Sequence, residues 1–159
     1  MDREVPADAW YVWIGVSIVS IGLAGVVVAL PAEPPPDAER AAGALDRVAA
    51  AGYDATVTLE HDADAVRIGP ERIAMRNNGG VSRARLSFGP VVPVDALEMT
   101  AAERTVIDGV IAGERPLPAG FERRLAGVDN ETGRWSPARG ALRARAVEVA
   151  GRRVVLVAV

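Results

Sequence analysis

The side chains best suited to catalysis or metal binding lie in one short segment, His61-Asp62-Ala63-Asp64. This segment holds the only histidine of the chain beside two carboxylates. Imidazole and carboxylate groups are common metal ligands, but a metal site needs at least three or four ligands in a defined geometry. No further ligand lies nearby in the sequence to complete such a set. The pattern therefore indicates a solvated turn, and we expect no metal and no other cofactor.

A second segment, Asn77-Asn78-Gly79-Gly80, has the glycine content of a phosphate-binding loop. Such a loop would be followed by a helix and by a basic residue placed to reach phosphates. The residues that follow alternate instead, with Ser82, Ala84, Leu86 and Phe88 on one face and Arg83, Arg85 and Ser87 on the other. Alternation predicts a strand, and Asn and Gly tolerate positive φ, so the segment predicts a β-hairpin turn.

No catalytic motif of known spacing is present. The chain has no cysteine, and it lacks the G-x-S-x-G, H-E-x-x-H and Walker patterns. Carboxylates that are distant in the sequence could still meet in space as an acid and base pair. That single route to catalysis stays open, but we expect the protein not to be an enzyme.

One modification signal is present, the sequon Asn130-Glu131-Thr132. The pattern N-x-S/T accepts N-linked glycans, although it is short enough to arise by chance. Asn130 is therefore a candidate glycosylation site, and its use would fit a domain on the outer side of a membrane.

All of these residues follow an apolar stretch from Trp10 to Leu30, which contains no charge, Asn, Gln or Pro. A helix of this length spans roughly 31 Å, close to the hydrocarbon thickness of a bilayer. Trp10, Tyr11 and Trp13 crowd one end, where aromatic rings favour the headgroup level. The stretch predicts a single transmembrane helix, with the lipid bilayer as its partner.

The alternative to a membrane anchor is a cleaved signal peptide, which would have a basic start and a shorter apolar run. The acidic start of this chain, MDREVPADA, argues against cleavage. Arg3 and the free amine precede the helix, whereas no basic residue follows it before Arg40. Because positive charge is retained inside, we expect a cytoplasmic tail at residues 1–9 and the remaining chain outside the cell membrane.

Small residues could form an association face on this helix. Gly25 and Ala29 are four residues apart, and Gly22 and Ala29 are seven apart, so the three share one face. Such faces let membrane helices approach closely, but small residues are also simply common in membrane helices. Both interpretations stay open.

The charges are unevenly distributed along the chain. All 18 basic residues are arginine; residues 32–71 carry nine acids and three arginines, and residues 115–159 carry nine arginines and four acids. The two segments could neutralise each other within one fold, or attract each other between copies. We expect no nucleic acid partner, because basic and aromatic residues do not interleave and the domain is expected outside the cell.

Beyond the helix, we expect a stiff Pro-rich spacer at 31–36 and a folded domain at 37–159. Asp37 would cap a helix that ends at Gly52, and Thr100 with Glu103 would open a second helix at 101–112. Strands are expected at 53–60, 65–68, 72–76, 82–88, 91–94, 142–149 and 152–159, with no clear pattern at 114–140. The fold class is therefore α+β, a small, mostly antiparallel sheet packed with two helices. The last strand is apolar on both faces, so it should be central.

The pattern as a whole resembles an uncharacterised family of single-pass membrane proteins from salt-loving archaea. The resemblance rests on WYVW at the start of the apolar stretch, on PPPD at 34–37 and on RIGPERIAMRNNGG at 67–80. It implies an association with pilus-like secretion and assembly components, and an outline similar to a type IV pilin. The chain departs from pilins in its acidic leader and in the prolines after its apolar stretch, which favours an accessory subunit over a major pilin.

Two functions follow as expectations. The first is a structural or accessory component of a pilus-like surface or secretion assembly, without catalysis. The alternative is a membrane-anchored extracytoplasmic module that binds a ligand or an envelope protein. A neighbouring gene for a secretion ATPase and a polytopic platform protein would favour the first, and isolated placement would favour the second.

Overall fold

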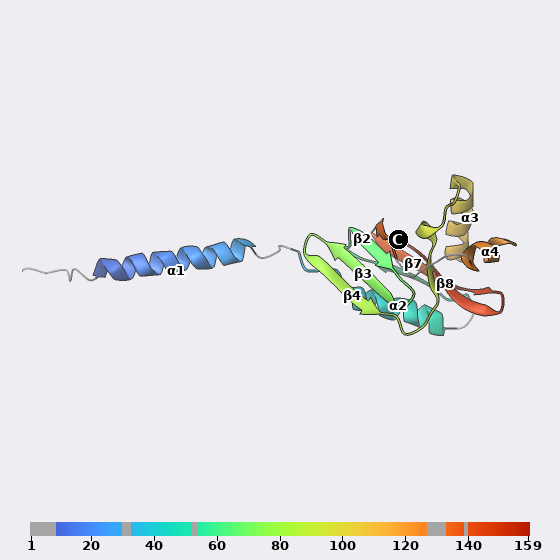
Figure 1. Cartoon of the computed structure of the whole chain (residues 1–159), viewed down its shortest axis with the longest axis horizontal. Helices are drawn as coiled ribbons and strands as arrows, with labels where there is room; N and C mark the ends of the chain where they lie inside the picture. Colours follow the sequence, from blue (N-terminus) through green and yellow to red (C-terminus); the bar gives the residue numbers. More distant parts are fainter. Residues whose placement is uncertain (1–8, 30–32, 52–53, 127–132, 139) are drawn as a thin grey trace, which may run out of the picture. The chain divides into compact units, whose positions relative to one another are not determined.

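The structure, a computed structural model, describes residues 9–29, 33–51, 54–126, 133–138 and 140–159. The chain divides into two units, residues 1–33 and 34–159 (Figure 1). The first unit contains one helix, α1 (Ala9–Ala29). This helix confirms the expected apolar helix within a residue at each end. Most of the expected cytoplasmic tail, residues 1–8, lies outside the described residues, as does Leu30.

The second unit confirms the α+β class. Its helices are α2 (Ala38–Ala50), a short 3-10 helix η1 (Val94–Ala96), α3 (Ala101–Ile111) and α4 (Phe121–Ala126). Its strands are β1 (Thr56–Glu60), β2 (Ala65–Ile68), β3 (Arg72–Asn77), β4 (Gly80–Arg85), β5 (Val91–Pro93), β6 (Trp135–Pro137), β7 (Ala141–Val149) and β8 (Arg152–Ala158).

The two longer helices of this unit begin at the expected caps. Asp37 accepts a hydrogen bond from the Arg40 N–H at 2.9 Å, and Thr100 with Glu103 forms a full capping box. Each cap satisfies donors that the first helical turn leaves free. The expected stop of α2, Gly52, lies outside the described residues; α3 is followed by Gly113, whose φ of +83° suits a glycine.

The strands form two four-stranded sheets, of order β1-β7-β8-β5 and β4-β3-β2-β6. All pairs are antiparallel except β5 with β8. The Asn78-Gly79 turn joins β3 to β4, as expected for a two-residue hairpin. Strand β6 lies within the stretch 114–140, where no strand was expected, and it pairs with β2 to add the fourth strand of the second sheet.

Strand β8 is central and buried on both faces, as expected from its composition. Val155 and Val157 join the core formed with α2 and the inner face of β2 and β3. Leu156 and Val154 face a second core formed with α3 and α4. The first sheet is therefore covered on both faces, which explains why this strand lacks polar alternation.

Two local expectations were wrong. The strand expected at 82–88 ends at Arg85, and Phe88 is 52% exposed. The physical reason is Asp46 on α2, whose carboxylate accepts hydrogen bonds from the backbone N–H groups of Ser87 and Phe88 at 2.9 and 3.1 Å. These donors are thereby taken out of the sheet ladder. The expected start of the first strand was also early, since Asp54 has a φ of 65° and Tyr53 lies outside the described residues.

The compact unit begins at Pro34, three residues before the expected domain start. The Asn77 side-chain amide donates to the Pro34 carbonyl at 2.9 Å, and Ser82 donates to the Pro36 carbonyl. A side chain at Gly80 would touch the Pro35 ring. The last three residues of the expected spacer are thus bound to the β3–β4 hairpin.

Candidate functional site

Helix α1 is the first candidate site because its surface has no partner in the described chain. From Trp10 to Val28 it is long and apolar enough to cross a membrane, and its large apolar side chains are all exposed. Gly22 and Gly25 lie on one side of this helix, and a Cβ at either position would meet no atom within 4 Å. Ala29 ends the helix, but its side chain lies outside the described part. An unpartnered apolar surface of this size is suited to lipid or to another membrane helix.

The histidine segment is an irregular connection between β1 and β2, with a bend at Asp64. The Ala63 N–H donates to Nδ1 of His61 at 3.2 Å, and the imidazole is half-buried. Burial lowers the pKa of His61 below its ordinary value of 6.5, and this outweighs the opposing effect of the Asp62 charge. Nε2 is buried without a hydrogen-bond partner among the described residues. Those residues also contain no group of three potential ligands arranged for a metal.

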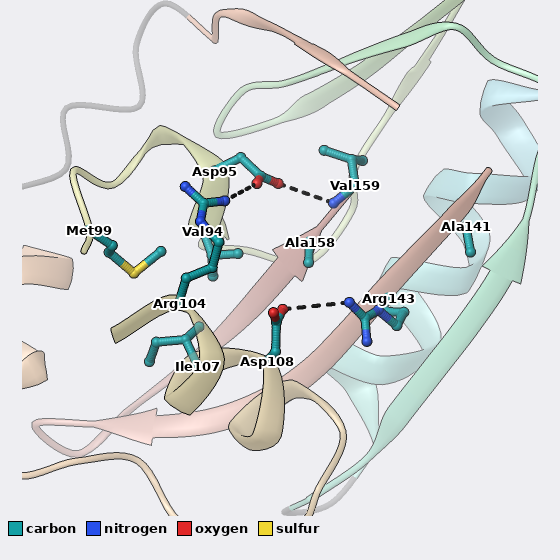
Figure 2. Close-up of a pocket in the computed structure, with 10 residues that line it drawn as sticks. All are labelled: Val94, Asp95, Met99, Arg104, Ile107, Asp108, Ala141, Arg143, Ala158 and Val159. Carbon is teal, nitrogen blue, oxygen red and sulfur yellow. Dashed lines mark hydrogen bonds and ion pairs between the residues drawn. The ribbon is translucent and has the colours of Figure 1, made fainter. Parts of the chain in front are cut away.

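A polar pocket lies between α3 and the ends of β7 and β8 (Figure 2). Two ion pairs flank it: Arg104 Nη1 lies 3.0 Å from Asp95 Oδ1, and Arg143 Nη2 lies 3.5 Å from Asp108 Oδ1. Asp95 also accepts a hydrogen bond from the Val159 N–H at 3.2 Å. The two aspartates and two arginines thus pair with one another.

The pocket encloses about 250 Å³, slightly less than the range of about 300–1,000 Å³ usual for small-molecule sites. Its carboxylates are held by guanidinium groups, and no serine, threonine or histidine is among the lining residues. The geometry provides no nucleophile beside a general base. The paired charges instead hold α3 and η1 against the first sheet.

A second, more apolar groove of about 450 Å³ runs between α3 and the segment that leads into α4. Val106, Ile107 and Phe121 contribute apolar surface, and Glu103 and Arg124 pair at its rim with a distance of 2.5 Å. Val106 is only half-buried because it lines this groove.

The outward face of the second sheet carries a set of arginines that only strand pairing brings together. We call it the arginine face and define it by Arg67, Arg72, Arg76, Arg83 and Arg85. The signal was present in the alternation of Arg83 and Arg85 along one strand. Its extension across β2 and β3 depends on strand pairing that the sequence does not specify.

The candidate glycosylation site Asn130 lies outside the described residues, so its glycosylation stays a prediction. The described chain stops at Ala126, the end of α4, and resumes at Gly133, two residues before β6.

The fold and sites define a class of protein: an α+β domain that follows an apolar helix long enough to cross a membrane. A family model matches residues 4–147 of the chain, so the chain belongs to that family, a family of unknown function (DUF7283). No curated protein and no solved structure matches the chain. Membership of an uncharacterised family is confirmed, and the archaeal and pilus-related parts of the resemblance stay predictions.

Proposed function

We propose that this protein is a single-pass membrane protein whose compact domain lies outside the cell and serves as an accessory part of a pilus-like surface or secretion assembly. The observation that carries the proposal is α1, a helix able to cross a membrane whose described side chains are exposed. In water such a surface would drive aggregation, whereas in lipid it needs no further cover.

The orientation rests on charge near the helix ends. Arg3 precedes α1, and the next basic residue after it is Arg40. Retention of positive charge on the inner side supports an N-terminus in the cytoplasm. The domain and Asn130 would then face outward.

A structural role without catalysis is supported by the way the charged groups are used. The carboxylates of the polar pocket pair with Arg104 and Arg143. The only histidine accepts a backbone hydrogen bond and has a lowered pKa. These groups stabilise local structure and leave no acid and base pair aimed at a shared substrate position.

The assembly itself and an origin in salt-loving archaea are supported by the sequence resemblance alone. The small-residue face of Gly22, Gly25 and Ala29 adds a surface on which another membrane helix could pack. An accessory subunit needs such lateral contacts, and it does not need the long continuous helix of a major pilin.

Deletion of the gene in the source organism tests this proposal. We expect fewer surface filaments in electron micrographs, or loss of a secreted product, with recovery on expression of the intact chain. Expression of a variant with two leucines, Gly22→Leu and Gly25→Leu, should restore less if helix packing is required. Unchanged filaments and secretion in the deletion strain would contradict the assembly role.

The apolar groove favours a second candidate, an anchored module that binds an envelope protein or a ligand. It is larger than the polar pocket, and half-buried Val106 and buried Phe121 line it between α3 and the segment that leads into α4. Gene neighbourhood separates the two candidates, because an assembly subunit is expected beside a secretion ATPase and a platform protein. A gene in isolation would favour the binding module.

A further inference from the structure

The arginine face is unusual in its uniform charge. Four of its five arginines are exposed, Arg67 is half-buried, and none forms an ion pair with a described residue. No acidic residue occupies an outward position of the four strands, all of which the structure describes. The remaining outward positions are Ala65, Ala74, Val81, Trp135 and Pro137.

The strand register sets these charges directly against one another. Arg72 on β3 is the cross-strand partner of Arg85 on β4. Arg67 and Arg83 flank the same residue, Ala74, from opposite sides. Like charges in such positions are destabilising. A protein surface normally intersperses the two signs, so the arrangement indicates an anionic ligand that would offset the repulsion.

Trp135 lies against two arginines of this face. The guanidinium carbons of Arg67 and Arg76 lie 5.3 and 4.7 Å from its ring centroid. A guanidinium over an aromatic ring keeps its N–H edge free for two parallel hydrogen bonds to an anion. Arginine suits phosphate oxygens in this way better than lysine does, because its donors form a fixed fork.

The connection to α1 indicates which anion is nearest. Pro34 and Pro35 are held on the turn of the β3–β4 hairpin, the hairpin that carries four of the five arginines. Five residue steps separate Ala29 from Pro34, which limits the connecting chain to roughly 18 Å. With α1 in a membrane, the headgroups of that membrane would therefore be presented to the domain at high effective concentration.

We propose that the arginine face binds the phosphate groups of anionic phospholipids in the membrane that α1 crosses. This proposal rests on the proposed membrane anchorage. Basic clusters beside a membrane helix are attracted to anionic lipid in this way. Trp135, with an apolar ring and one polar edge, is suited to the same interface.

The test uses the complete chain in lipid vesicles, with Trp10→Phe and Trp13→Phe so that Trp135 is the only tryptophan. Quenching of Trp135 by neutral acrylamide is measured in phosphatidylcholine vesicles and in vesicles with equal parts of phosphatidylcholine and phosphatidylglycerol, at low ionic strength. We expect the quenching constant to fall by about half in the anionic vesicles, because the headgroups cover the face.

The double variant Arg83→Gln and Arg85→Gln should lose this difference between the two lipids. The matched control, Arg123→Gln and Arg152→Gln, removes the same charge from exposed positions elsewhere and should keep it. Thermal melting of both variants checks that the fold is retained.

Equal quenching in the two lipids would overturn the proposal, and so would an equal loss in both double variants. Stronger protection by added poly-aspartate in phosphatidylcholine vesicles would also overturn it, in favour of an acidic protein partner. Alkaline carbonate extraction separates this failure from failure of the anchor. A chain that stays in the vesicles without lipid-dependent quenching contradicts only the role of the arginine face, whereas an extracted chain contradicts the anchor.

Discussion

Arg145 joins three segments of the domain through its guanidinium group. Nη1 donates to the Val110 carbonyl at 2.5 Å and to the Arg115 carbonyl at 3.0 Å, and Nη2 lies 2.6 Å from Asp54 Oδ1. The Val110 carbonyl belongs to the last turn of α3, where positive charge also complements the helix dipole. Because Asp54 is 75% exposed, we expect the two carbonyls to contribute more than the ion pair.

Replacement of this arginine, Arg145→Met, should therefore lower the free energy of unfolding by about 2–4 kcal/mol, since buried acceptors lose their donor. Chemical denaturation of the full chain in detergent measures it. Arg143→Met removes a half-exposed pair and should cost about 0–1 kcal/mol. Equal losses for the two variants would show that Arg145 does not join these segments.

His61 provides a pH-dependent contribution to stability. Its pKa is lowered from 6.5 by burial, so the unfolded chain takes up the proton first as the pH falls. The stabilisation is fully present above about pH 6.5 and is lost as the pH falls through the lowered pKa of the folded state. Glu103 is a second group with a lowered pKa, but it titrates below its ordinary value of 4.5 and so outside this window.

We expect the melting temperature of the parent chain to fall between about pH 7.5 and pH 5.5. In His61→Asn this fall should be smaller, because an asparagine oxygen can accept the Ala63 N–H without titrating near neutrality. Parallel melting curves of the two proteins across this range would contradict the assignment.

At the scale of elements, a substitution in β8 tests whether this strand lies in the interior of the first sheet. Leu156 is fully buried between β7, β5 and the helices of the second core. Leu156→Asp would put an unpaired charge there, at a cost of several kcal/mol out of a total of about 5–15 kcal/mol. We expect this variant to unfold in thermal melting, whereas exposed Arg152→Ala on the same strand should change the midpoint little. A near-parental midpoint for Leu156→Asp would make β8 peripheral.

Replacement of two glycines by alanine should change the stability of the domain in opposite directions. Gly43 lies mid-helix in α2 with no atom within 4 Å of an added Cβ, so Gly43→Ala should stabilise the domain by about 0.5–1 kcal/mol. At Gly133 an added Cβ would overlap the Ile68 carbonyl, a backbone atom that cannot move aside cheaply. Gly133→Ala should therefore weaken the β2–β6 pairing and lower the unfolding midpoint. The same sign for both substitutions would contradict this packing.

The elements that could be predicted from the sequence are those whose signals are local. The caps at Asp37 and Thr100, the Asn78-Gly79 turn and the apolar final strand each depend on neighbours in the chain. Strand β6 could not be predicted, because three residues gain their conformation from pairing with β2. The polar pocket and the arginine face could not be predicted either, since both combine residues from strands and helices that only the tertiary fold brings together.

At the scale of the whole molecule, the central claim is an anchored domain on the outer side of a membrane. The chain has no cysteine, so single cysteines can be placed without background. Phe88 is an exposed position in the domain, and Asp2 precedes α1 in the sequence.

The most direct measurement is labelling of Phe88→Cys and Asp2→Cys on intact cells with a maleimide that cannot cross membranes. We predict that Phe88→Cys is labelled at once and that Asp2→Cys is labelled only after the cells are lysed. Alkaline-washed membranes should retain both chains, as expected for a spanning helix. Labelling of Asp2→Cys on intact cells with protection of Phe88→Cys would contradict the account.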